Sequence, residues 1–232
     1  MIGFFDSGVG GLTILEAVKQ RLPDLSTAYL ADHEHAPYGN RPREEILELT
    51  WAGCEKLFAQ GCTLVIIACN TASANALREI QQTRMGKYPG RNVIGILRPT
   101  VEELSKRGYR EIAILSTKAT KNSGAYEAEF AKFNPDIKVV SHACPNWVGF
   151  VESKQIDSPE CLADVKREIQ ALEQEAPDME AVLLGCTHFP YLTEAIRSSL
   201  KRAVPIIDQG PIVADSLADY LRRHPKYLSP LH

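Results

Sequence analysis

The stretch "LVIIACNTAS" (64–73) decides the fold class of this 232-residue chain. Its apolar run is typical of a buried strand, and the polar residues after the cysteine stand where a helix must begin. A second stretch, "AVLLGCTHFP" (181–190), has the same arrangement. Each half of the chain therefore delivers one cysteine, Cys69 or Cys186, from a strand into a helix.

The rest of the chain alternates short apolar runs with longer amphipathic segments. Strands are predicted at 2–5, 27–31, 63–68, 93–96, 111–115, 137–141, 180–184 and 204–207. Helices are predicted at 11–21, 42–59, 72–83, 100–107, 123–132, 158–174, 191–201 and 211–222. This alternation predicts an α/β fold with mainly parallel sheets, in which ligands bind at the carboxyl ends of the strands.

The similarity between the two cysteine stretches predicts two similar α/β lobes. Lobe 1 would contain residues 1–95 together with the returning segment 205–232, and lobe 2 would contain residues 96–204. Strand-end loops of parallel sheets meet at one edge, so a cleft between the lobes would collect the loops of both. We therefore expect the active site in that cleft, with the two thiols facing each other.

Composition and charge limit the class of protein. The formal net charge of −3 argues against nucleic acid as a partner. The N-terminus has no basic region of the kind that opens a secretory signal, and no apolar run reaches the ~18 residues of a membrane span. The six cysteines form no CxxC pair and read as reduced thiols. We expect a cytoplasmic protein.

Both cysteines stand at predicted helix N-termini, where the helix dipole favours a thiolate. A single cysteine at a strand end is more often a small packed hydrophobic residue, but two of them flanked by hydroxyl and amide groups indicate function. His188, two residues after Cys186, is in reach to exchange a proton with that site. Asp6, at the end of the first strand, is either a helix cap or a polar partner for an ammonium group or a thiol.

Two loops near the N-terminus have ligand-binding character. "FFDSGVGGLTIL" (4–15) lacks the third glycine of a dinucleotide fingerprint, but its backbone N–H groups and Ser7 near a helix start suit a carboxylate. "ADHEHAPYGNRP" (31–42) could in principle hold a metal, but no further ligand cluster accompanies it, and a solvated loop is the simpler interpretation. Its "PYGN" segment suits the lining of a pocket.

Two later segments add further polar groups. Thr117 and Thr120 follow another predicted strand, where ordinary helix capping would also explain them. "ACPNWVGFVES" (143–153) reads as an irregular stretch that brings Glu152 along, and the cysteine within it is more typical of a structural residue.

Together these loops offer two thiols, a carboxylate near each (Asp6 and Glu152), a histidine and several hydroxyl donors. No metal constellation and no complete phosphate cradle is found among the motifs. This symmetric set suits racemisation, in which one base removes a proton from one face of a carbon and a second group returns one to the other face. Because an unassisted cysteine is only roughly a few per cent thiolate at pH 7, each thiol needs help from a helix dipole and a neighbour.

The stretches "FDSGVGGL", "PYGN", "ACNTAS", "ACPNWVGFVE" and "LGCTHFP" occur in this order over nearly the whole chain. They resemble those of the cofactor-independent glutamate racemases, in the aspartate/glutamate racemase superfamily. The resemblance implies interconversion of L- and D-glutamate for bacterial peptidoglycan synthesis, with no cofactor and no metal. It also implies that Cys69 and Cys186 are the paired bases, that Asp6 assists Cys69, and that His188 and Glu152 serve Cys186.

The resemblance further implies substrate contacts from Asp6, Ser7, Tyr38, Gly39, Asn70, Thr71, Thr117, Thr120, Thr187 and His188. The chain departs from the family's usual pattern at Arg98 and Thr100, where an acidic residue and a glycine are common. It also carries Ser116 where glycine is usual and Gln209 where a smaller residue is common. These departures leave lobe closure, oligomer geometry (a homodimer is one option) and the preference for glutamate over aspartate open.

Three other functions compete with this interpretation. An aspartate racemase would use the same two cysteines with a tighter pocket. A cysteine hydrolase would use Cys186 and His188 and leave Cys69 idle. A non-catalytic amino-acid-binding protein would need neither thiol. A racemase that uses pyridoxal phosphate needs a Schiff-base lysine, and no motif nominates one.

Overall fold

Two four-stranded parallel sheets form the frame of the computed structural model, which describes residues 1–228. The strands are β1 (Ile2–Asp6), β2 (Thr27–Ala31), β3 (Leu64–Ile67), β4 (Asn92–Gly95), β5 (Glu111–Ser116), β6 (Lys138–Ala143), β7 (Ala181–Gly185) and β8 (Ile206–Ile207). Their order is β2-β1-β3-β4 in one sheet and β6-β5-β7-β8 in the other, so the second sheet repeats the topology of the first. The predicted α/β fold with two similar lobes is confirmed.

Helices fill the connections between the parallel strands. They are α1 (Leu12–Arg21), α2 (Arg43–Ala59), α3 (Asn70–Asn75), α4 (Leu77–Thr83), α5 (Leu97–Leu104), α6 (Lys118–Ser123), α7 (Ala125–Phe133), α8 (Trp147–Glu152), α9 (Pro159–Glu175), α10 (Thr193–Ser199) and α11 (Gln209–Arg223). Among residues 1–228, none of these helices is long and apolar enough to cross a membrane.

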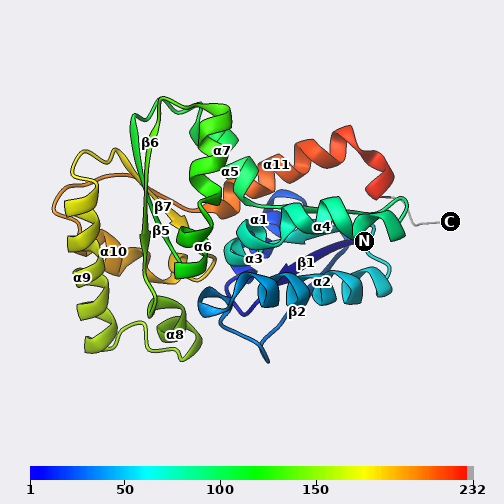
Figure 1. Ribbon diagram of the computed structural model, residues 1–232, viewed down its shortest axis with the longest axis horizontal. Helices are drawn as coiled ribbons and strands as arrows, with labels where there is room; N and C mark the ends of the chain where they lie inside the picture. The colour runs from blue at the N-terminus through cyan, green and yellow to red at the C-terminus, as the bar shows by residue number, and fades with distance from the viewer. Residues whose placement is uncertain (229–232) are drawn as a thin grey trace.

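The two sheets share one hydrophobic core. Helix α2 covers the outer face of the first sheet, and α9 and α10 cover the outer face of the second (Figure 1). On their other faces, Phe4 and Ile66 of the first sheet and Ile114 and Leu183 of the second belong to a single buried cluster. Helices α1, α5, α7 and α11 complete this cluster between the sheets. The lobes are therefore joined by continuous apolar packing on the side opposite their outer helices.

Helix α11 returns the chain from the second sheet to the first lobe. Strand β8 pairs with β7 in the second sheet, with Ile206 opposite Val182. Helix α11 begins just after it and packs along α1 and against α5, as Figure 1 shows for the orange and red part of the ribbon. The lobe boundaries at 95/96 and 204/205 stay a prediction.

Two helical predictions and one prediction of irregular structure differ from the structure. The segment 72–83 forms two helices, α3 and α4, which meet at Ala76, where φ is −115°. The segment 123–132 is interrupted at Gly124, whose φ of 61° lies in the left-handed region that glycine adopts without strain. The prediction of an irregular stretch at 143–153 is wrong, because Trp147 and Val151, one helical turn apart, bury the same face of α8.

We predict that Gly53→Ala in α2 destabilises the protein. In a helix interior this exchange normally stabilises by up to about 1 kcal/mol. Here a Cβ at position 53 would overlap the ring of Phe5, which is fully buried in β1. Overpacking of a close-packed core costs about 1–3 kcal/mol and should outweigh the gain in helix propensity. Urea unfolding gives the free energy of unfolding of both proteins.

The matched control is Gly149→Ala in α8, because a Cβ at that position meets no atom within 4 Å. This variant should be as stable as the natural protein or slightly more stable. A Gly53→Ala protein that unfolds at the same urea concentration as the Gly149→Ala protein would show that β1 and α2 are packed less closely than described.

Candidate active site

A small buried pocket lies at the carboxyl ends of the central strands of both sheets and contains both cysteines. It is lined by Ser7, Pro37, Tyr38, Gly39, Cys69, Asn70, Thr71, Thr117, Val148, Cys186, Thr187 and His188. Ser7 and Cys69 follow β1 and β3, and Thr117 and Cys186 follow the equivalent strands β5 and β7. The repeated topology therefore brings four strand ends to one cavity, as expected for parallel sheets.

The cavity is small. Its volume is about 10 Å³, which is about the space that one water molecule needs. An amino acid is several times larger than a water molecule. Side chains or loops of the pocket must therefore move before a substrate of that size can enter.

Cys69 is a neutral thiol in this environment. Its Sγ accepts a hydrogen bond from the N–H of Ala72 at 3.4 Å and lies 3.5 Å from Oγ of Ser7. Burial, with a smaller contribution from the charge of Asp6, raises the pKa of Cys69 to about 12, although the hydrogen bonds from Ser7 and Ala72 oppose the shift. The expected help from the helix N-terminus is thus present but is outweighed by desolvation.

Cys186 has a cationic neighbour instead. Its Sγ lies 3.9 Å from Nδ1 of His188, whose Nε2 lies 2.6 Å from Oε1 of Glu152. Burial alone would lower the pKa of His188, but the hydrogen bonds with Cys186 and Glu152 outweigh it and raise that pKa to about 10. The hydrogen bond from His188 in turn lowers the pKa of Glu152. His188 is therefore an imidazolium at neutral pH, held between a sulfur atom and a carboxylate.

Asp6 connects the two halves of the site. Its carboxylate is fully buried and accepts hydrogen bonds from the N–H of Gly8 at 2.8 Å and from Oγ1 of Thr187 at 3.2 Å. Burial raises the pKa of Asp6, although the charge of His188 and these hydrogen bonds act in the opposite direction. Asp6 belongs to β1, but its partner Thr187 follows β7, so this carboxylate contacts the Cys186 loop as well as influencing Cys69.

The glycine-rich turn at 4–15 binds a carboxylate of the protein itself. The N–H of Val9 donates to Oε1 of Glu152 at 3.1 Å. A Cβ at Gly10 would lie 2.5 Å from Nδ1 of His188, so only glycine lets the turn approach the second lobe this closely. The turn has the anion-binding chemistry that its sequence indicates, but Glu152 occupies at least one of its N–H groups.

Three threonine hydroxyls form a chain across the pocket. Oγ1 of Thr71 lies 2.9 Å from Oγ1 of Thr117, which lies 3.0 Å from Oγ1 of Thr120. Thr71 belongs to α3 of the first lobe, whereas Thr117 caps α6 of the second. These hydroxyls bridge the two lobes directly and can exchange partners when a ligand with charged oxygens enters.

The loop 31–42 closes the pocket from outside. The hydroxyl of Tyr38 donates to Oδ2 of Asp32 at 2.6 Å, so it is engaged within the loop. A Cβ at Gly39 would lie 2.8 Å from Cβ of Thr117, which shows how tightly the loop is seated on the second lobe. His35 is a second partner of Asp32, at 2.8 Å. Within residues 1–228, no three His, Cys, Asp or Glu side chains are placed to hold a metal ion.

Asn70 carries a buried donor that faces no partner. Its Oδ1 accepts a hydrogen bond from the hydroxyl of Tyr126 at 2.6 Å. Its Nδ2 is buried and has no hydrogen-bond partner among the described residues. A buried unpaired amide N–H₂ costs free energy unless a ligand supplies the acceptor. Asn70 lines the pocket that contains both cysteines.

The structure adds residues that the sequence analysis did not select. Val148 supplies an apolar wall of the pocket, and Tyr126 donates a hydrogen bond to Asn70. Tyr126 lies in α7 and is spaced like any core residue of an amphipathic helix, so the sequence gives no local signal for the role of its hydroxyl group. Pro37 belongs to the predicted pocket segment "PYGN", and it lines the pocket together with Tyr38 and Gly39.

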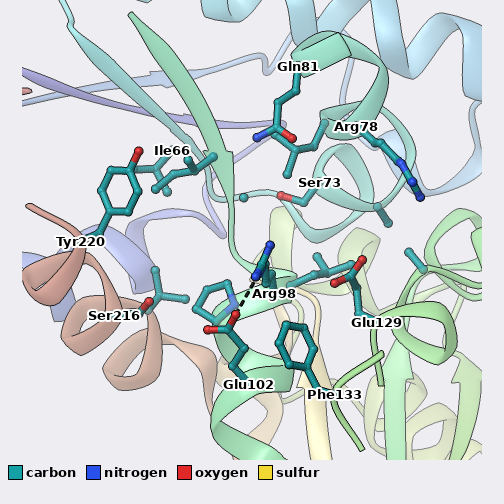
Figure 2. A pocket seen from close by; sticks show the side chains of 18 of the residues that line it. Ile66, Ser73, Arg78, Gln81, Arg98, Glu102, Glu129, Phe133, Ser216 and Tyr220 are labelled. Atoms are coloured by element: carbon teal, nitrogen blue, oxygen red, sulfur yellow. Dashed lines mark hydrogen bonds and ion pairs between the residues drawn. The ribbon is translucent and has the colours of Figure 1, made fainter. Parts of the chain in front are cut away.

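A much larger cavity lies elsewhere, between α4, α5, α7 and α11, with a volume of about 960 Å³ (Figure 2). Arg78, Arg98, Glu102 and Tyr220 lie on its walls, and Arg98 is paired with Glu102 at 2.8 Å. Neither cysteine and none of the other predicted site residues lines it. We therefore assign the chemistry to the small pocket, where the thiols, the imidazolium and the buried carboxylate meet.

Comparison with known proteins identifies similar chains. Residues 12–217 match the family model described as Asp/Glu/Hydantoin racemase. The chain is 40% identical to the glutamate racemase of Roseobacter denitrificans, over 97% of this chain and 86% of that protein. It superposes on glutamate racemase isoform RacE1 from Bacillus anthracis with a TM-score of 0.88, at 31% identity, covering 100% of this chain and 85% of the other. The glutamate racemase of Francisella tularensis in complex with D-glutamate gives a TM-score of 0.87 at 30% identity, covering 100% and 84%.

We predict that Glu152→Gln lowers the pKa of His188, because it removes one of the hydrogen bonds to a charged partner that hold the imidazolium. The folded-state pKa of about 10 lies above the ordinary value of 6.5. The stability from this group is therefore fully present below about pH 6.5 and is lost as pH rises towards 10. In the variant this loss should still begin near pH 6.5, but it should be smaller and should end at lower pH, because only the folded-state pKa changes. An NMR titration of the His188 ring protons measures the pKa directly.

Glu194→Gln is the matched control, because the substitution removes the same charge from a side chain in α10 that is 89% exposed. It should leave the titration of His188 unchanged. An unaltered pKa in Glu152→Gln would mean that Glu152 does not hold the imidazolium.

Proposed function

The chain belongs to the Asp/Glu/Hydantoin racemase family, and from this premise we propose that Cys69 and Cys186 are its two acid–base groups. The protein is an isomerase that interconverts L- and D-glutamate, and D-glutamate serves peptidoglycan synthesis. One observation carries the assignment of the two groups. Both thiols line a single buried pocket, each at the end of an equivalent strand from a different sheet.

The two thiols have different neighbours in the resting protein. Cys69, with a pKa of about 12, holds its proton at pH 7. His188 is a cation beside Cys186. In the resting state that we propose, Cys69 is therefore the acid and Cys186 is the base, because a two-base racemase needs one of each before its first turnover.

The proton balance of one turnover follows from this state. The Cys186 thiolate removes the α-proton of the substrate and becomes a thiol. Cys69 gives its own proton to the opposite face of the α-carbon and becomes a thiolate. The hydrogen bonds from Ser7 and the N–H of Ala72 stabilise that thiolate. Because burial raises the pKa of Asp6, its carboxyl group binds a proton more readily than an exposed one. We propose that Asp6 takes up a proton from water and passes it to the Cys69 thiolate after the turnover, while Cys186 loses its proton to water.

The remaining predicted residues are proposed to hold the substrate. Asn70 would donate its unpaired N–H₂ to a substrate carboxylate oxygen. The hydroxyls of Ser7, Thr71, Thr117, Thr120 and Thr187, together with Tyr38, Gly39, Asp6 and His188, would surround the substrate's charged groups. Entry would require the loop 31–42 to lift from the second lobe, because the closed cavity has no room for an amino acid.

The cellular setting is part of the same proposal. We place the protein in the cytoplasm, without a bound cofactor, with glutamate as its small-molecule partner and with no nucleic acid partner, in keeping with a net charge of −3. A homodimer is the oligomeric state that we propose to test first.

We predict that purified protein racemises L-glutamate and acts little on L-aspartate, without added cofactor. The reason is the similarity of the chain to glutamate racemases, together with a pocket rich in hydroxyl and amide donors. Circular dichroism of the amino acid in solution follows the reaction. Dialysis against a metal chelator and treatment with a carbonyl reagent should not change the rate. Faster turnover of aspartate would overturn the substrate assignment.

We predict that Cys69→Ala and Cys186→Ala each reduce racemisation by at least roughly 10²-fold, the lower end of what a general acid or base contributes. The loss is expected in both directions, because each thiol is the acid in one direction and the base in the other. The fold should survive, as far-UV circular dichroism can show. Cys161→Ala, also a buried cysteine but in α9, is the matched control and should keep its activity. A single-cysteine variant within tenfold of the natural rate would exclude the two-base mechanism.

We also predict the source of the incoming proton. In heavy water, early product formed from L-glutamate should carry deuterium at the α-carbon, while the remaining L-glutamate carries almost none. The reason is that the thiol that removes the proton is not the thiol that delivers one. The reaction from D-glutamate should give the mirror result. Proton NMR of early product that retains its original α-hydrogen would contradict two facing thiols.

A further inference from the structure

We propose that Gln209 and Thr100 set the orientation of the Asn70 amide in the substrate pocket, acting through the hydroxyl of Tyr126. This inference rests on the proposed role of Asn70 as a substrate contact. Gln209 and Thr100 do not touch the pocket, so they are positioning residues and not catalytic ones. Their effect is to decide whether Asn70 offers its N–H₂ or its oxygen to the substrate.

The four side chains form one buried hydrogen-bond chain from helices α11, α5, α7 and α3. Nε2 of Gln209 donates to Oγ1 of Thr100 at 2.9 Å and to the hydroxyl oxygen of Tyr126 at 3.0 Å. The Tyr126 hydroxyl donates to Oδ1 of Asn70 at 2.6 Å. All four residues are at most 2% exposed, so bulk water cannot replace a missing partner.

A backbone carbonyl fixes which groups donate and which accept along these hydrogen bonds, at the end farthest from the pocket. The hydroxyl of Thr100 donates its only proton to the carbonyl oxygen of Ile96 at 2.8 Å. Its oxygen can therefore only accept from Gln209, which must turn its N–H₂ towards Thr100 and Tyr126. If the Gln209 amide were reversed, two acceptor oxygens would face each other at hydrogen-bond distance.

The same donor and acceptor requirements fix the orientation of the Asn70 amide at the pocket. Because Gln209 donates to Tyr126, the tyrosine oxygen is an acceptor on that side and its proton goes to Asn70. Asn70 must then present Oδ1 to Tyr126, which leaves Nδ2 for the pocket, where it has no partner among residues 1–228. The chain thus holds an unpaired donor in place for a substrate carboxylate.

Thr100 and Gln209 are two of the positions at which this chain departs from the pattern of the family it resembles. In the structure these two departures are direct hydrogen-bond partners. A glycine at 100 would supply no hydroxyl, and a smaller residue at 209 would not span the distance to both oxygens. The two residues therefore act as one hydrogen-bonded pair.

The decisive variant is Gln209→Glu, which has nearly the same shape but replaces the donor N–H₂ by an acceptor oxygen. Tyr126 would then donate to position 209, and Asn70 would turn its oxygen towards the substrate. We expect the KM for L-glutamate to rise about tenfold or more, the effect of losing one hydrogen bond to a charged group. The kcat should stay within about threefold, because both thiols and their neighbours are untouched.

The same substitution in an Asn70→Ala protein distinguishes an effect on the orientation of Asn70 from a general disturbance of the fold. Asn70→Ala alone should raise the KM by about tenfold or more, and adding Gln209→Glu should then change it no further. If Gln209→Glu raises the KM equally in both backgrounds, it acts by its charge or by disturbing the fold, and the proposal is wrong. If Asn70→Ala leaves the KM unchanged, the proposal is also wrong, whereas the two-thiol function is judged by the cysteine variants alone.

A second variant covers the case that a carboxylate at position 209 prevents folding. Thr100→Val keeps the shape but frees the Gln209 amide to reverse, and should raise the KM by about threefold, in keeping with one neutral hydrogen bond. This rise should again vanish in the Asn70→Ala background. Thr50→Val in α2 is the matched control, because Thr50 is equally buried and its hydroxyl has no partner among the described residues. A Thr100→Val protein with the KM of the Thr50→Val protein would overturn the proposal.

Discussion

The proposed active site depends on hydrogen bonds that cross from one parallel sheet to the other at their carboxyl ends. Asp6 accepts from Thr187, and the N–H of Val9 donates to Glu152. Each of these carboxylates is desolvated by the lobe that it joins, and such groups are stable only when their oxygens are paired. The pairing across the lobes therefore determines both the shape of the pocket and the charges inside it. Neither lobe contains a site by itself.

Two similar strand ends acquire different surroundings from this arrangement. Cys69 and Cys186 are both buried, and both follow the third strand of their sheet in chain order. Cys69 is the N-cap of α3, as predicted, but the prediction of a helix N-terminus at Cys186 is wrong, because a turn separates it from the short 3-10 helix Phe189–Leu192. The difference lies in their neighbours, a carboxylate at Asp6 and an imidazolium at His188. Both neighbours come from the same lobe as their cysteine. The other lobe contributes by hydrogen bonds, from Thr187 to Asp6 and from the N–H of Val9 to Glu152.

The sequence predicted the parts of the protein that depend on local pattern. All eight strands were visible as apolar runs, and the two cysteine stretches indicated where parallel strands end. The helix α8 was missed because the six residues from Trp147 to Glu152 are too few to show a helical period. The pKa of Cys69 was misjudged because burial is a tertiary property, and it exceeded the helix-dipole effect that sequence reasoning could include.

The contacts made by Gln209 illustrate the same limit more strongly. Gln209 lies two residues before the predicted helix 211–222, and its partners lie 83 and 109 residues away along the chain. No periodicity or motif links residues at such separations. Their meeting follows from the packing of the start of α11 against α5 and α7, which only a three-dimensional arrangement reveals.

The shared hydrophobic cluster between the sheets has a consequence for how the molecule can move. Because Phe4 and Ile114 pack into one core with α1 and α11, pulling the lobes fully apart would expose that apolar face to water. Opening is therefore restricted to the rim where the strand-end loops meet, while the shared core stays packed. Because of this shared core we expect the two lobes to unfold together, so that a destabilising substitution in either lobe also affects the pocket that contains the thiols.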